Sequence, residues 1–143
     1  MKTIHVSLLS LSLCVFFAFQ ANAQTKISWP LLAKVSYEGS EAEGNGVPVF
    51  DEMITTLDSQ IVEIEGYMLP LTVDNQRYIL SRYPFYNCYF CGNAGRETVI
   101  ELHPKAKEWE FDIDDKVKIR GKLILVEDTE SLIFELVEAE EAD

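Results

Sequence analysis

The clearest pattern in the chain is a strict alternation over residues 116–125. Apolar or small residues stand at every second position, Val117, Ile119, Gly121, Leu123 and Leu125, with lysine or arginine at most positions between them. Successive side chains of a strand point to opposite faces, so the pattern predicts a strand with one buried and one solvated face. Residues 62–68 alternate in the same way, with Glu63 and Glu65 on the polar face.

Three further runs rich in β-branched and aromatic residues predict strands over residues 77–83, 97–103 and 132–137. Turn residues at 74–75 and 127–130 separate them from their neighbours. We therefore expect five strands in all.

One helix is expected before the first strand. The spacing of apolar residues over 48–58 is helical, Pro48 lies near the first turn, and Asp51 and Glu52 favour a helix N-terminus. The preceding residues 24–46 are expected to form an arm and a solvated loop.

The two central glycines, Gly66 and Gly121, stand inside the first and fourth predicted strands. Glycine permits the sharp bend that closure of a small sheet requires. The expected fold is mostly β, a small five-stranded OB-like Greek-key barrel with one short N-terminal helix, because an immunoglobulin-type sandwich needs about seven strands. The barrel domain is expected over residues 47–138, and the acidic tail, residues 139–143, is expected to fray.

Residues 1–23 have the pattern of a cleaved signal peptide. Lys2 precedes an apolar run over residues 6–19, and Ala21 and Ala23 form a small-x-small cleavage site. The apolar run is shorter than the roughly 20 residues that span a bilayer. The sequence thus predicts a periplasmic or secreted protein that is not transmembrane.

Charge excludes one class of partner. The chain holds 12 basic and 24 acidic residues. The signal contains one lysine and no acid, so the mature chain carries 11 − 24 = −13 formal charges. Nucleic acid is not expected as a partner, because its binding relies on basic residues that displace counterions from phosphates.

Cys88 and Cys91 are the two cysteines of the mature chain, and their spacing leaves three chemistries open. Oxidation outside the cytoplasm favours a disulfide that stiffens the loop. A zinc-like divalent metal would need further ligands, and His103 is the candidate third. A reactive thiol pair usually stands at a helix N-terminus, whereas turn residues follow at 92–95.

Five aromatic residues surround the cysteines: Tyr83, Phe85, Tyr86, Tyr89 and Phe90. Some are expected to cap one end of the barrel core. Five rings in eight positions do not all turn inward easily, so an exposed patch that binds an envelope protein is also predicted.

Residues 61–71, the following strand over 77–83 and the cysteine-bearing loop resemble the bacterial exported domain-of-unknown-function family numbered 3299. The resemblance covers about residues 47 to 138 and implies a periplasmic OB-like domain. Many members of that family follow the first loop cysteine, here Cys88, with a histidine and a proline run, whereas this sequence has Tyr89 and Phe90. The family brings no established activity with it.

The sequence favours a non-enzymatic accessory module that binds a metal ion or an envelope protein through this loop. His103 is the one histidine of the mature chain, so the chain offers no other histidine for a Ser/His/Asp catalytic set. The alternative is an exported thiol-disulfide oxidoreductase that uses Cys88 and Cys91.

The signal pattern makes a direct prediction. The mature protein is expected to begin at Gln24, because Ala21 and Ala23 precede it at the positions that signal peptidase reads. Intact mass and N-terminal sequencing of the exported protein measure this. Recovery of a diacylated Cys14, or of the uncut signal, would contradict it.

Overall fold

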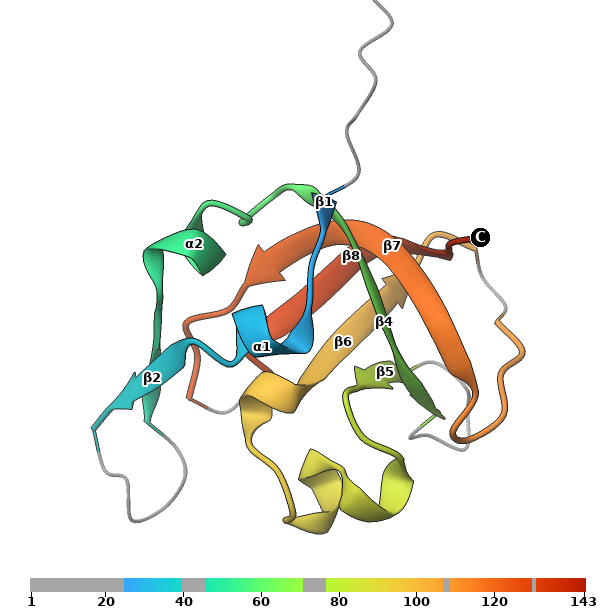
Figure 1. Cartoon of the computed structure of the whole chain (residues 1–143), viewed down its shortest axis with the longest axis horizontal. Coiled ribbons are helices and arrows are strands. Elements are labelled where there is room, and N and C mark those ends of the chain that lie inside the picture. Colours follow the sequence, from blue (N-terminus) through green and yellow to red (C-terminus); the bar gives the residue numbers. More distant parts are fainter. Residues whose placement is uncertain (1–24, 40–45, 71–76, 107–108, 130) are drawn as a thin grey trace, which may run out of the picture.

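The computed structural model describes residues 25–39, 46–70, 77–106, 109–129 and 131–143 (Figure 1). The predicted signal, residues 1–23, lies outside the described residues. So do the turn at 74–75 and most of the loop predicted before residue 47.

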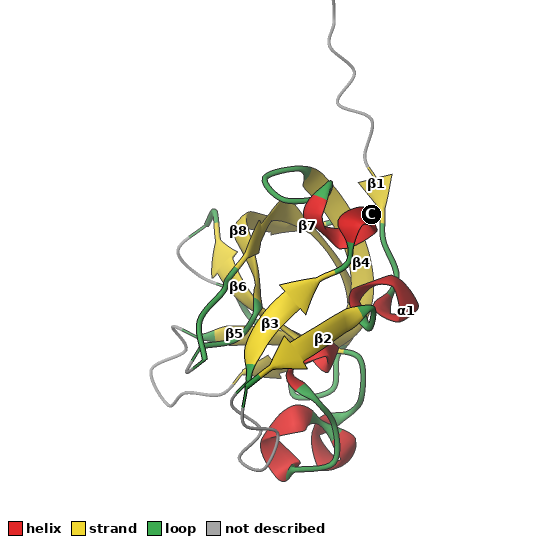
Figure 2. Cartoon of the chain, turned by 90° about the vertical axis from the view of Figure 1, so that its left-hand side faces the viewer, coloured by secondary structure: helices red, strands yellow, loops and turns green. Residues whose placement is uncertain are grey.

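Five strands form a closed barrel, which confirms the predicted fold class. They are β4 (Ile61–Pro70), β5 (Tyr78–Ser81), β6 (Val99–Pro104), β7 (Lys116–Leu125) and β8 (Phe134–Glu141). The order is β4-β5-β6-β8-β7, and β7 returns to pair with β4. The β6–β8 pair is parallel and the other four are antiparallel. Figure 2 shows this Greek-key barrel nearly end-on.

The alternation seen in the sequence matches the barrel geometry. β7 has the predicted bounds, with Ile119 and Leu123 fully buried. In β4 the apolar set faces the core as expected, and Met68 is fully buried. Glu63 differs from the expectation. It is 7% exposed, and its carboxylate lies 3.7 Å from the Lys26 ammonium of the N-terminal segment that pairs with β4.

The interior divides into a main core and a small second cluster. The main core fills the barrel, and Phe134, Ile64, Leu80, Ile100 and Leu136 are among its buried members. The second cluster lies under the loop between β5 and β6 and contains Leu69, Ile79, Cys88, Val99 and Leu132. That loop therefore packs on an apolar cluster that is separate from the main core.

Both strand glycines stand where another backbone approaches closely. A Cβ atom at Gly66 would lie 2.7 Å from the Ser81 carbonyl oxygen and 2.9 Å from Leu80 Cγ. One at Gly121 would lie 3.1 Å from the Val137 carbonyl oxygen. The β7–β8 register also shifts beside Gly121. Glycine at these positions thus permits both the close packing and the curvature of the barrel.

The N-terminal arm lies along β4. β1 (Thr25–Lys26) pairs parallel to it, and α1 (Trp29–Leu32) follows. The Ile27 amide donates to the Glu63 carbonyl at 2.9 Å, and Trp29 Nε1 donates to the Glu65 carbonyl at 2.7 Å. The arm therefore satisfies backbone acceptors along the edge of β4 that β5 does not reach.

The helix predicted over residues 48–58 is mostly wrong. β2 (Val35–Glu38) and β3 (Val47–Phe50) form a hairpin, and α2 covers only Glu52–Thr55. The Asp51 carboxylate accepts from the Met53 amide at 2.9 Å and caps the helix there. Val49 and Phe50 pair with β2 instead, and the Phe50 ring lies 5.8 Å from that of Phe134. The described residues thus contain two short α-helices, α1 and α2, rather than one.

The expectation that the acidic tail frays is also wrong. β8 continues to Glu141, and Ala139 is fully buried. Arg120 donates from Nε and Nη2 to Glu140 Oε1, at 3.1 and 2.6 Å. Two neighbouring strands and a small residue against Gly121 outweigh the low apolar content of the tail. No helix in the described ranges is long and apolar enough to cross a membrane.

Close approach at Gly66 predicts a stability effect. Gly66→Ala is expected to lower the free energy of unfolding by about 1–3 kcal/mol, because the added methyl meets a backbone carbonyl. Urea unfolding measures this. The control is Glu65→Ala, which removes only the exposed ion pair with Lys116 and should cost below about 1 kcal/mol. Equal effects of the two changes would contradict the prediction.

Candidate functional site

The loop that carries the cysteines joins β5 to β6, and we call residues 82–95 the cysteine loop. It contains two 3-10 turns, Phe85–Asn87 and Tyr89–Cys91, and a third turn, Arg96–Thr98, leads into β6. The Phe85 amide donates to Asp114 Oδ1 at 2.7 Å, and Asn93 Nδ2 donates to the Tyr86 carbonyl at 2.9 Å. These bonds hold the loop in one shape against the barrel.

The two cysteines differ in environment. Cys88 is fully buried in the second core cluster, whereas Cys91 is exposed, and both thiols are free. The Cys91 thiol donates to the Phe85 carbonyl oxygen at 3.1 Å. Desolvation, and then the neighbouring Cys88 thiol, raises the pKa of Cys91. An activated redox cysteine needs the opposite shift. The disulfide remains a prediction.

His103 lies in β6, where its Nε2 is 3.2 Å from Glu135 Oε2. Within the described ranges, no three His, Cys, Asp or Glu side chains come together in a group that could hold a metal ion. The structure therefore does not bring Cys88, Cys91 and His103 together as one ligand set.

The five loop aromatics divide between the two predicted roles. Phe85 and Tyr89 pack against the second core cluster and cap it. Tyr86 is 81% exposed and Phe90 is 44% exposed. Tyr83 is half-buried beneath the Arg82 guanidinium, whose Cζ lies 5.1 Å from the ring centroid. Two rings of the set are thus free for contact with a partner.

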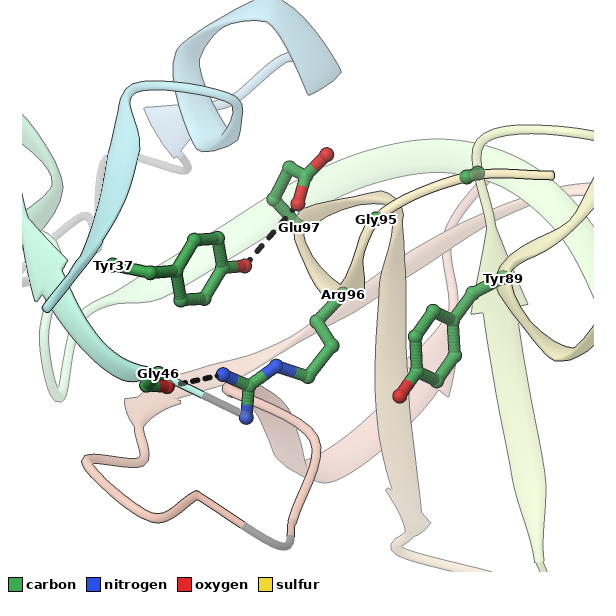
Figure 3. A pocket seen from close by; sticks show the side chains of 7 residues that line it. Tyr37, Gly46, Tyr89, Gly95, Arg96 and Glu97 are labelled. Carbon is green, nitrogen blue, oxygen red and sulfur yellow. Dashed lines mark hydrogen bonds between the residues drawn. The ribbon is translucent and has the colours of Figure 1, made fainter. Parts of the chain in front are cut away.

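A pocket of about 420 Å³ opens beside the loop, and we call it the Arg96 pocket (Figure 3). Its lining residues are Tyr37, Gly46, Tyr89, Ala94, Gly95, Arg96 and Glu97. They come from the β2–β3 hairpin, the cysteine loop and the turn before β6. Segments distant in sequence therefore build it together.

Arg96 joins these segments, and it is 5% exposed. Its Nη2 donates to the Gly46 carbonyl at 2.5 Å, and its Nη1 donates to those of Asp128 and Thr129 at 3.3 and 3.1 Å. Its Cζ lies 4.9 Å from the centroid of the Tyr37 ring. Sequence reasoning missed this residue, because nothing in the local pattern marks a single arginine before a strand as buried.

Tyr37 and Glu97 point toward each other at the pocket wall, as Figure 3 shows. The Tyr37 hydroxyl donates to Glu97 Oε2 at 3.2 Å. Burial, and then the charge of Glu97, raises the pKa of Tyr37 well above its usual range. The Glu97 carboxylate folds over Gly95, where an added Cβ would collide with its oxygens.

A second pocket of about 400 Å³ lies next to the first, and we call it the Arg82 pocket. Its lining residues are Arg82, Tyr83, Asn87, Asn93, Ala94, Gly95, Glu97 and Thr98. Ala94, Gly95 and Glu97 belong to both pockets. Ala94 and Gly95 are small residues shared by the two pockets, and the Glu97 carboxylate lies over Gly95.

The comparisons with known proteins bear on the fold. No family model matches the sequence, and no curated protein matches it either. The structure is similar to the crystal structure of a DUF3299 family protein from Pseudomonas aeruginosa PAO1, with a TM-score of 0.54 and 12% identity. The match covers 85% of this chain and 97% of that one. The resemblance noted in the sequence is therefore confirmed at the level of the fold.

The thiol environments predict an unequal reactivity. In the reduced, folded protein, iodoacetamide is expected to label Cys91 and to spare the buried Cys88. Labelling of Cys91 at pH 7 should be slower than that of a free small-molecule thiol, because its pKa is raised. Mass spectrometry against time measures both. Labelling faster than the free thiol would favour the oxidoreductase alternative, and Cys91→Ser serves as the unlabelled control.

Tyr37 predicts a pH dependence at alkaline pH. Its folded pKa lies above the value of about 10 for the unfolded chain, so its contribution to stability is complete below pH 10 and is lost as the pH rises above it. Stability measured by urea unfolding between pH 9 and 11 should fall less steeply in Tyr37→Phe. The exposed Tyr86→Phe should follow the wild type. Identical slopes for all three proteins would contradict the assignment.

Proposed function

We propose that this chain is an exported, non-enzymatic binding module that holds an extended segment of another exported protein against the cysteine loop. One observation carries the proposal. Tyr86 and Phe90 are exposed on a loop whose backbone is tied down beside two adjoining pockets. Exposed aromatic rings next to concave surface are typical of interfaces, where they supply most of the buried apolar area.

The order of the loop supports binding. Binding normally costs the entropy of every side chain and backbone segment that it immobilises. Here the Phe85 amide and the Asn93 side chain already hold the loop, and Cys88 anchors it in the second core cluster. Much of the loop's conformational entropy is therefore already lost during folding and is not lost again on binding.

The chemistry of the site favours a polypeptide over a metal ion. The pocket walls combine aromatic rings, small residues and a few hydrogen-bonding groups, which suits peptide side chains. The loop offers two sulfurs, whereas a structural zinc site needs four ligands. The raised pKa of Cys91 likewise disfavours a role as a redox nucleophile.

Export is part of the proposal and rests on the pattern of residues 1–23. In that location the partner would be a protein of the periplasm or the cell envelope. The net charge of the mature chain remains the reason to set nucleic acid aside, although OB-like barrels invite that comparison.

Photo-crosslinking in the native compartment tests the function. A photoreactive residue at position 86 is expected to give discrete protein adducts. The matched control is position 53, because Met53 is 48% exposed on α2, which lies at the opposite end of the molecule from the loop (Figures 1 and 2). Phe90→Ser should lower the adduct yield at position 86 severalfold while stability changes by less than about 0.5 kcal/mol. Equal, diffuse adducts from positions 86 and 53 would refute the proposal.

A further inference from the structure

The cysteine loop and its boundary have an unusual charge for this chain. Residues 82–96 contain two arginines and no acidic residue, although the whole chain holds 24 acidic and 12 basic residues. Both arginines line pockets, Arg82 one and Arg96 the other. This stretch is thus less acidic than the chain as a whole, although Glu97 follows it directly and lines both pockets, and the Asp114 carboxylate accepts from the Phe85 amide within it.

The four arginines of the chain use their guanidinium groups differently. Arg77 donates from Nε and Nη2 to the two carboxylate oxygens of Glu101, both at 2.9 Å, and Arg120 pairs with Glu140. Arg96 donates to backbone carbonyls. The Arg82 guanidinium makes no hydrogen bond or ion pair with any residue in the described ranges. It makes a cation–π contact with the Tyr83 ring. Its donors are open to a ligand.

Hydrogen bonds nevertheless hold the backbone on both sides of Arg82. The Arg82 amide donates to the Thr98 carbonyl at 2.9 Å. The hydroxyl of the fully buried Ser81 donates to the Tyr83 carbonyl at 2.7 Å and accepts from the Tyr83 amide at 3.1 Å. The backbone of Tyr83 is therefore held in place, and the Arg82 guanidinium lies over its ring, with Cζ 5.1 Å from the centroid. A planar guanidinium matches a carboxylate with two parallel hydrogen bonds.

The Arg82 pocket has the surroundings that a carboxylate needs. Its volume of about 400 Å³ has room for a carboxylate, and Asn87 and Asn93 are among its lining residues. The Asn93 side-chain amide already donates to the Tyr86 carbonyl. Glu97 is the one acidic residue in the described lining, and its Oε2 already accepts the Tyr37 hydroxyl. Next to it, the Arg96 pocket presents the Tyr37 and Tyr89 rings to an apolar side chain.

We infer that the Arg82 pocket binds the side-chain carboxylate of an acidic residue in the partner segment, while the Arg96 pocket takes an apolar side chain of the same segment across Ala94 and Gly95. This inference rests on the proposed function and adds the chemistry of the ligand. The segment would be an extended, acidic and aromatic or aliphatic stretch of an exported protein.

Paired peptide libraries test the inference. The peptides carry one aromatic residue and, within three positions of it, either Glu or its neutral isostere Gln, with both termini blocked. The best Glu peptides are expected to bind the wild type about tenfold to a hundredfold more tightly than their Gln twins, as for one charge-assisted hydrogen-bonded pair. Fluorescence polarisation at fixed salt concentration measures this.

Protein variants assign the effect to Arg82. Arg82→Gln should remove the preference for Glu over Gln peptides, and Arg82→Lys should recover part of the preference. Lys122→Gln makes the same change of charge on β7 and should keep the full preference. Thermal melting of each variant confirms that the fold is intact.

The other outcomes separate the inference from the proposed function. Equal binding of Glu and Gln peptides, lost in the Tyr86→Ser/Phe90→Ser variant, would overturn the carboxylate site and leave the binding module standing. Binding that requires a free peptide C-terminus would overturn the side-chain source of the carboxylate. Failure of the wild type to bind any peptide of either library would overturn both.

Discussion

The pairing of β7 with β4 is the constraint on which the rest of the molecule depends. It runs over seven residue pairs, from Ile61 opposite Lys122 to Tyr67 opposite Lys116, and it closes the barrel. Closure removes the exposed edges of an open sheet and lets β8 lie between β6 and β7. The parallel pairing of β8 with β6 brings the turn before β8 against Arg96 in the turn before β6, although 32 residues separate Arg96 from Asp128. The closed barrel thus holds together the segments that build the pocket walls.

Arg96 links the barrel to the candidate site. Its guanidinium bonds to Gly46, Asp128 and Thr129, so it joins the β2–β3 hairpin and the turn before β8 to the cysteine loop. Burying a charged group is costly unless hydrogen bonds compensate, and each of these carbonyls would in turn lose a donor without it. Its Nε remains without a partner among the described residues. The arrangement positions Tyr37 by stacking, and through Tyr37 it positions Glu97.

The sequence predicts those strands in which apolar and polar residues alternate regularly. β7 has a clean period of two with one buried face, so its bounds and orientation follow directly. The apolar positions before the first strand fit a helix, but Val49 and Phe50 instead pair with β2, a contact that no local period shows. The prediction that the acidic tail frays is likewise wrong, because Ala139 is buried by β6, β7 and Gly121, which the local composition of the tail does not reveal. For the site, the sequence identifies the loop and its exposed rings, whereas the burial of Arg96 depends on carbonyls at positions 46, 128 and 129.

The charge of the chain gives the proposed site its selectivity. A chain with 12 excess negative charges repels an acidic segment over most of its surface, so such a segment gains affinity only where a cation is presented to it. Arg82 is presented in this way, stacked on Tyr83 with its donors open, and the rings of Tyr86 and Phe90 stand on the same loop. Apolar contact alone would accept many segments. Because unpaired carboxylates are repelled elsewhere, the pairing with Arg82 would set the register in which one segment lies across the two pockets.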